Sequence, residues 1–152
     1  MNEINKILVG ICFSRYCLDT LLFATKLAQR LEAQLIIANI INVRDVEQVS
    51  QIEAMGFAVD AAAYIRGVEE EREKSLNEMI QVTGYPSDQI KAVFRVGHPD
   101  VELLKLIDEK DIDMVVIGKK GNDDIEHAMM GSVAKRVIRH SPVTVVSHRK
   151  RD

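Results

Sequence analysis

Short apolar runs and helix-like stripes of apolar residues alternate along the whole chain. The apolar runs are five to eight residues long and rich in Ile and Val. Runs of this length and composition are typical of strands in a parallel sheet that is covered on both faces. They predict five strands, over residues 6–11, 34–41, 90–96, 113–118 and 143–147.

Between these runs, apolar residues recur every three or four positions, which is the spacing of an amphipathic helix. We expect a first helix from Ser14, as its N-cap, to about Leu31, and a second over residues 58–83. Pro99 suits the first turn of a third helix, which reaches about Lys110. A last stripe is formed by Met130, Val133, Ala134, Val137 and Ile138.

Strands that alternate with helices in this way predict an α/β fold, an open parallel sheet whose crossovers are right-handed. No internal repeat or linker interrupts the pattern, so we expect a single domain over residues 1–152. The pattern assigns no element to residues 42–57, the least regular stretch, where Gly56 is an expected break.

Composition narrows the class of protein. The chain has 20 basic and 23 acidic residues and a net charge of −3, which gives no electrostatic case for binding nucleic acid. The N-terminus lacks the pattern of a signal peptide, and no apolar run approaches the ~20 residues that span a membrane. We therefore expect a soluble, cytoplasmic protein with no membrane contact. Cys12 and Cys17 lack a CxxC spacing, and we expect small, partly buried thiols rather than a redox pair.

Candidate chemistry lies after the first and fourth strands, because ligands of open α/β sheets bind beyond the carboxyl ends of strands. Residues 10–14, GICFS, match neither GxGxxG nor a P-loop. After the fourth strand, Gly118 and Gly121 are followed, nine residues later, by Gly131 and Ser132 at the start of a helix. Glycines let backbone N–H groups approach a phosphate, and a helix N-terminus attracts anions. The alternatives are turn and packing roles for the glycines and simple helix capping for Ser132.

The spacing G-x2-G-x9-G-S, with the ending SPVTVVS, resembles the signature of the universal stress protein family. KILVGICFS resembles the family's first strand and turn, QLIIANI its second strand, and VGHPDVELLKLI its third strand–helix junction. The resemblance extends over essentially the whole chain and is weakest over residues 42–85.

The resemblance implies an adenine nucleotide alpha hydrolase-like fold, with strand order 3-2-1-4-5 and helices on both faces. It also implies ATP, ADP or AMP as ligand at the switch point between the first and fourth strands. The implied nucleotide-binding residues are Gly10, Cys12, Ile40, Ile117, Gly118, Gly121, Gly131, Ser132 and Val133. The implied partner is a second copy of the chain, which would pair through the last strand at Val143, Thr144, Val145 and Val146.

Two features depart from the family pattern. Cys12 stands where the family commonly has an Asp that contacts the nucleoside, and losing such a hydrogen bond costs about 1.5–3 kcal/mol. The nine-residue gap carries Asp123, Asp124 and Glu126, which would repel a triphosphate unless a cation such as Mg²⁺ intervenes. Lys119 and the lysine that follows it would offset part of this repulsion.

The function implied by the resemblance is a dimeric stress-response module that senses an adenine nucleotide and serves an unknown partner protein. The sequence offers no convincing nucleophile or general base, so we expect a binding protein rather than an enzyme, with slow ATP hydrolysis left open. The four histidines lack a zinc-ligand spacing, so we expect no metal site from them. The alternative is a dimeric interaction protein of the same family that has lost nucleotide binding, for which Cys12 and the acidic gap argue.

Overall fold

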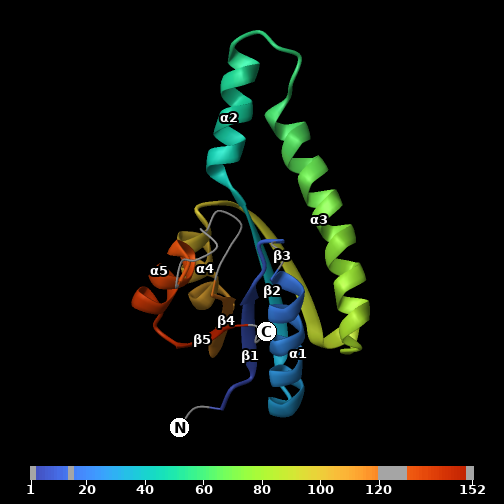
Figure 1. The fold of residues 1–152 in the computed structure, drawn as a ribbon, viewed down its shortest axis with the longest axis vertical. Helices are drawn as coiled ribbons and strands as arrows, with labels where there is room; N and C mark the ends of the chain where they lie inside the picture. Colours follow the sequence, from blue (N-terminus) through green and yellow to red (C-terminus); the bar gives the residue numbers. More distant parts are fainter. Residues whose placement is uncertain (1–2, 14–15, 120–129, 150–152) are drawn as a thin grey trace.

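A five-stranded parallel sheet forms the centre of the molecule (Figure 1). The computed structural model describes residues 3–13, 16–119 and 130–149. The strands are β1 (Lys6–Gly10), β2 (Gln34–Asn42), β3 (Ile90–Gly97), β4 (Met114–Gly118) and β5 (Thr144–His148). Their order is β3-β2-β1-β4-β5, so the expected fold class and strand order are confirmed.

Helices cover both faces of the sheet. One face packs against α1 (Cys17–Leu31) and α3 (Ala61–Thr83), and the other against α4 (Pro99–Glu109) and α5 (Ser132–His140). The strand β1 shows the alternation, because Ile7 and Val9 belong to the first layer and Leu8 to the second. All three side chains are fully buried. Burial on both faces is the physical reason for the near-continuous apolar runs.

A helix lies within residues 42–57, to which the sequence pattern assigned no element, so that interpretation is wrong. The helix is α2 (Val43–Ala54), and its N-cap is Asn42, whose side chain accepts a hydrogen bond from the N–H of Arg44 at 3.0 Å. None of its residues is buried. Its stripe is narrow, with apolar residues at every third position, as Val43, Val46, Val49 and Ile52. With α3 it forms a helical hairpin that projects beyond the carboxyl edge of the sheet (Figure 1).

Capping residues set the other helix boundaries. The helix α3 begins three residues later than expected, because the side chain of Asp60 accepts a hydrogen bond from the N–H of Ala62 at 2.9 Å. It ends at Gly84, whose φ of 69° is left-handed. Pro99 lies in the first turn of α4, as expected. The expected N-cap Ser14 lies outside the described residues. Among the helices described, none is long and apolar enough to cross a membrane.

Candidate functional site

A cavity of about 600 Å³ opens at the carboxyl edge of the sheet. It lies where β1 and β4 adjoin, and this is the switch point, because the chain crosses from β1 to β2 on one side and from β4 to β5 on the other. The helix starts of α1, α2, α4 and α5 and the middle of α3 complete its wall. A volume of this size suits a drug-sized or nucleotide-sized ligand.

The structure brings together the candidate nucleotide-binding residues that it describes. Those lining the cavity are Gly10, Cys12, Ile40, Ile117, Gly118, Gly131, Ser132 and Val133. The remaining candidate, Gly121, lies outside the described residues, as do Asp123, Asp124 and Glu126. Residues from four separate segments therefore converge on one cavity.

The end of β1 supplies the floor of the cavity and packs closely against α4. A Cβ built at Gly10 would lie 3.2 Å from Leu103 Cδ1 of α4, so the Leu103 side chain would have to shift by a few tenths of an ångström. The chain continues past the strand, with the N–H of Ile11 donating to the carbonyl of Ala38 at 2.9 Å. Phe13 then adopts φ 56°, a left-handed conformation that is costly for a bulky residue.

A buried amide holds this turn in place. Asn39 of β2 is 1% exposed, and its Nδ2 donates to the carbonyl of Ile11 at 2.6 Å. Its Oδ1 accepts a hydrogen bond from Nη1 of Arg72 on α3, also at 2.6 Å. The guanidinium carbon of Arg72 lies 5.8 Å from the centre of the Phe13 ring, which is within cation–π range. The α3 helix is therefore fastened to the turn that carries Cys12.

The opposite wall of the cavity is the start of α5. Gly131 is its N-cap, and the N–H of Gly131 donates to the carbonyl of Lys119 at 2.7 Å. Ser132, at the first helical position, is exposed and lines the cavity. The N-cap is glycine, so Ser132 does not cap this helix, and the simple capping alternative is wrong. The first N–H groups and the helix dipole give this wall a positive character.

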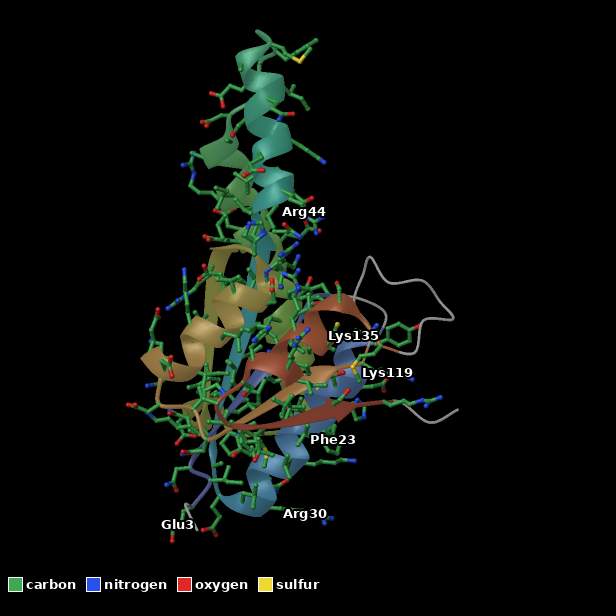
Figure 2. The ribbon with its side chains drawn as sticks, turned by 90° about the vertical axis from the view of Figure 1, so that its left-hand side faces the viewer. Glu3, Phe23, Arg30, Arg44, Lys119 and Lys135 are labelled. Atoms are coloured by element: carbon green, nitrogen blue, oxygen red, sulfur yellow. The ribbon has the colours of Figure 1, made fainter. Side chains whose placement is uncertain are left out.

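Charged residues at the cavity favour an anion. Among the described residues, four basic ones line it, against two acidic ones: Arg44, Arg72, Lys119 and Arg136, against Asp45 and Asp100. Asp100 forms an ion pair with Arg136 at 3.0 Å. Burial opposes ionisation of Asp100, but the hydrogen bonds from Arg136 and from nearby backbone N–H groups outweigh it, and the pKa of Asp100 lies below its ordinary value. Figure 2 shows Arg44 at the base of the helical hairpin and Lys119 at the end of β4.

The two cysteines lie in different surroundings. Cys12 is exposed and lines the cavity, whereas Cys17 is half-buried, with its Sγ 3.8 Å from Sδ of Met79. Burial, with a smaller effect of Cys12, raises the pKa of the Cys17 thiol. Cys17 is the small, partly buried hydrophobe that we expected, whereas the same expectation is wrong for Cys12, which is exposed. Within the described ranges, no three His, Cys, Asp or Glu residues cluster as metal ligands.

The most informative residue that the sequence reasoning missed is Arg72. The sequence analysis gave it no role, and it directly follows the acidic residues 69–71. A signal was present, because Arg72 lies four residues after Val68 and four before Leu76, on the stripe that faces the sheet. Asn39 was likewise hidden within the apolar run of β2, where a lone polar residue marks a specific hydrogen-bonding role.

The fold and the cavity define a class of protein: an open, doubly wound α/β domain with a ligand cavity at its switch point. Within that class, the profile of the universal stress protein family matches residues 3–147. The chain therefore belongs to the universal stress protein family.

Individual relatives agree with this assignment. A universal stress protein of Methanothermobacter thermautotrophicus is 33% identical over 60 residues, which is 40% of each chain. The matches to this and two Methanocaldococcus jannaschii relatives span only 39–51% of those relatives. Among solved structures, UspA from Lactobacillus plantarum superposes with a TM-score of 0.70 at 20% identity, covering 98% of this chain and 100% of that one.

Two further solved structures contain nucleotides. A universal stress protein in complex with cAMP has a TM-score of 0.66 and 24% identity, covering 97% of this chain and 98% of that one. A universal stress protein from Archaeoglobus fulgidus in complex with dAMP has a TM-score of 0.60 and 17% identity, covering 97% and 100%. At these identities the likeness shows a shared fold.

Proposed function

We propose that the protein binds an adenine nucleotide in the cavity at the β1/β4 switch point and acts as a nucleotide-sensing regulatory module of the cytoplasm. The observation that carries the proposal is the convergence of the motif residues Gly118, Gly131 and Ser132 with Gly10 and Ile40 around one cavity. Two proteins of the same fold are described as complexes with cAMP and dAMP, which supports an adenine nucleotide as ligand.

Each wall of the cavity has a separate role in the proposal. The N–H groups at the start of α5 and the Ser132 hydroxyl would hold the phosphates, where the positive dipole end and Lys119 favour negative charge. The backbone of Ile40, at the end of β2, would accept and donate hydrogen bonds to the adenine edge. The ribose would then lie over the ends of β1 and β4, beside Cys12 and Gly118.

In this proposal the protein binds rather than catalyses. Of the two acidic residues described at the cavity, Asp100 is paired with Arg136, and a paired carboxylate of lowered pKa is a poor general base. Mg²⁺ is proposed only together with bound ATP. The carboxylates that could ligate it, those of Asp123, Asp124 and Glu126, lie outside the described residues.

Acid extraction of the purified protein, followed by chromatography of the extract, tests whether a nucleotide is retained. The nucleotide-free protein is then titrated with ATP, ADP and AMP, with and without Mg²⁺, and binding is detected from its thermal unfolding. Because a ligand that binds only the folded state stabilises it, we expect Tm to rise with ligand concentration. No retained nucleotide and no change of Tm at millimolar ligand would reject the proposal.

We also propose a homodimer that forms through β5. This strand ends the sheet, and its exposed edge carries Thr144, which is exposed, and Val145 and Val146, which are half-buried. An unpaired edge strand offers backbone groups to a second copy. Light scattering is expected to give twice the chain mass of 17.1 kDa. A monomer at all accessible concentrations would contradict this part of the proposal.

A further inference from the structure

Among the described basic residues of the cavity wall, Arg72 has printed contacts that anchor it to the end of β1. Its Nη1 donates to Oδ1 of the buried Asn39 at 2.6 Å, and its guanidinium lies 5.8 Å from the ring centre of Phe13. The other end of the Asn39 amide is bonded to the carbonyl of Ile11. These contacts hold Arg72 against the residues on both sides of Cys12, and both Arg72 and Cys12 line the cavity.

The charge of Arg72 is not cancelled by this anchoring. Its hydrogen-bond acceptor is a neutral amide, and the aromatic ring favours a cation above it. A guanidinium has five N–H donors in a fixed planar fork. The bond to Asn39 uses one, so the remaining donors are oriented in advance, and a half-buried position strengthens their attraction for an anion.

The guanidinium of Arg72 and the start of α5 lie on opposite faces of the sheet, at its carboxyl edge. Asn39 has the same parity along β2 as Leu35 and Ile37, which face α1 and α3. The start of α5 lies on the other face, with α4. The cavity therefore has two positively polarised regions, and the ends of β1 and β4 lie between them.

We propose that Arg72 forms a second anion subsite, so that the cavity selects a nucleotide that carries a phosphate on the 2′ or 3′ oxygen of the ribose as well as at the 5′ end. This inference rests on the proposed function, in which the 5′ phosphate lies at α5 and the ribose over β1 and β4. Guanidinium groups bind phosphate oxygens bidentately, and a nearby arginine is the usual means of accepting a ribose phosphate. A 3′,5′-cyclic phosphate is one group on one side of the ribose and cannot reach both regions.

Equilibrium titration of the wild-type protein tests the inference with four ligands: AMP, adenosine 2′,5′-bisphosphate, adenosine 3′,5′-bisphosphate and cyclic AMP. We expect one of the bisphosphates to bind at least about tenfold more tightly than AMP, since a charge-assisted contact is worth that much or more. The two bisphosphates distinguish the 2′ from the 3′ position. Cyclic AMP is expected to show no such gain.

Substitution then assigns the gain to the side chain. In Arg72→Gln the bisphosphates are expected to bind no better than AMP binds to the same variant. Arg66→Gln is the matched control, since Arg66 lies on the same helix, is exposed and is not part of the cavity. The control should keep the full gain. Arg72→Lys keeps the charge without the fork and is expected to keep a reduced gain.

The outcomes separate this inference from the proposed function. Tight binding of AMP with no gain for either bisphosphate overturns the subsite and leaves nucleotide binding intact. A gain that persists in Arg72→Gln also overturns it. If none of the four ligands binds, the subsite fails, and the titration with ATP and ADP then decides the proposed function. The wild-type comparison decides the matter even if Arg72→Gln does not fold, which circular dichroism would reveal.

Discussion

The buried amide of Asn39 joins three parts of the molecule that are distant in sequence. It lies on β2, donates to the turn after β1 and accepts from Arg72 on α3. The turn contains Phe13 in a left-handed conformation, which persists only where surrounding contacts determine it. The shape of the cavity therefore depends on a side chain that no nucleotide motif contains.

Replacement of Asn39 by Ala removes both hydrogen bonds. It leaves the carbonyl of Ile11 and the guanidinium of Arg72 without these partners, and each unsatisfied group costs about 1–3 kcal/mol. We expect the free energy of unfolding to fall by about 2 kcal/mol or more, measured by urea denaturation. Asn77→Ala, at an exposed position of α3, is the control and should change it by less than about 0.5 kcal/mol. Equal effects of the two substitutions would contradict the role of Asn39.

His148, at the end of β5, packs its ring against α1. The ring stacks on Phe23 with centroids 4.8 Å apart, and Nδ1 lies 3.4 Å from Oγ1 of Thr20 (Figure 2 labels Phe23). Burial lowers the pKa of His148, and the nearby charge of Asp19 opposes this only in part. The folded protein therefore binds a proton at this position less readily than the unfolded chain does.

Stability should consequently fall in mild acid. A lowered pKa contributes stability that is fully present above the ordinary value of about 6.5 and is lost as the pH falls below that value toward the lowered pKa. We expect the Tm of the wild-type protein to decline between pH 7.5 and 5.5, and that of His148→Phe, which keeps a ring against Phe23, to decline less. His140→Phe, at an exposed position, is the control and should follow the wild type. Parallel declines in all three proteins would refute this origin of the pH dependence.

The helix α3 contains two glycines whose different backbone conformations determine how substitution by Ala changes the stability of the protein. Gly67 lies in the interior of the helix, and Gly84 ends it with a φ of 69°. A Cβ at either position would meet no atom within 4 Å. Substitution by Ala at these two sites therefore tests backbone conformation without a steric contribution.

The two substitutions should have opposite signs. Gly67→Ala is expected to stabilise the protein by about 0.5–1 kcal/mol, because Ala has the higher helix propensity. Gly84→Ala is expected to destabilise it by about 1–2 kcal/mol, because the left-handed conformation crowds a Cβ. Each change is measured by denaturant unfolding, with the other variant as the control. Changes of the same sign would show that the end of α3 is not held in this conformation.

The apolar runs predicted all five strands to within one residue at either end, including β3 and β5, whose residues are half-buried or exposed. The strands β1, β2 and β4 have buried interiors, and their apolar runs located them to within a residue or two. The helix α2 was missed because none of its residues is buried, so its narrow stripe resembled an irregular segment. Its N-cap Asn42 is a usable signal for a helix start. Asn42 is also the last residue of β2, so no loop separates the strand from the helix.

At the scale of the whole molecule, glycine spacing predicted one wall of the site and long-range packing determined the other. The motif placed Gly118, Gly131 and Ser132 at one edge of the sheet, because parallel strands bring their carboxyl ends together. It could not reveal Arg72, which reaches the cavity only because α3 packs across the sheet from a distant part of the chain. The residue pair Arg72 and Asn39 is separated by 33 positions, and periodicity reports no contact of that range.

The molecule carries a net charge of −3, yet four basic and two acidic residues of the described part of the chain line its cavity. This contrast concentrates positive potential where the proposed ligand carries its negative charge. The substitution Ser132→Glu tests the position of the phosphates and keeps the fold. It places a carboxylate in the first turn of α5, where negative charge stabilises a helix.

Isothermal titration of wild type and Ser132→Glu with AMP therefore tests the central claim most directly. The charge-matched control is Ser87→Glu, because Ser87 is exposed and lies outside the cavity. We predict one AMP per chain for wild type and Ser87→Glu. Ser132→Glu should bind at least about tenfold more weakly because its carboxylate repels the phosphate. Absence of AMP binding by the wild type at millimolar concentration, or equal affinity of all three proteins, would contradict a nucleotide site at this edge of the sheet.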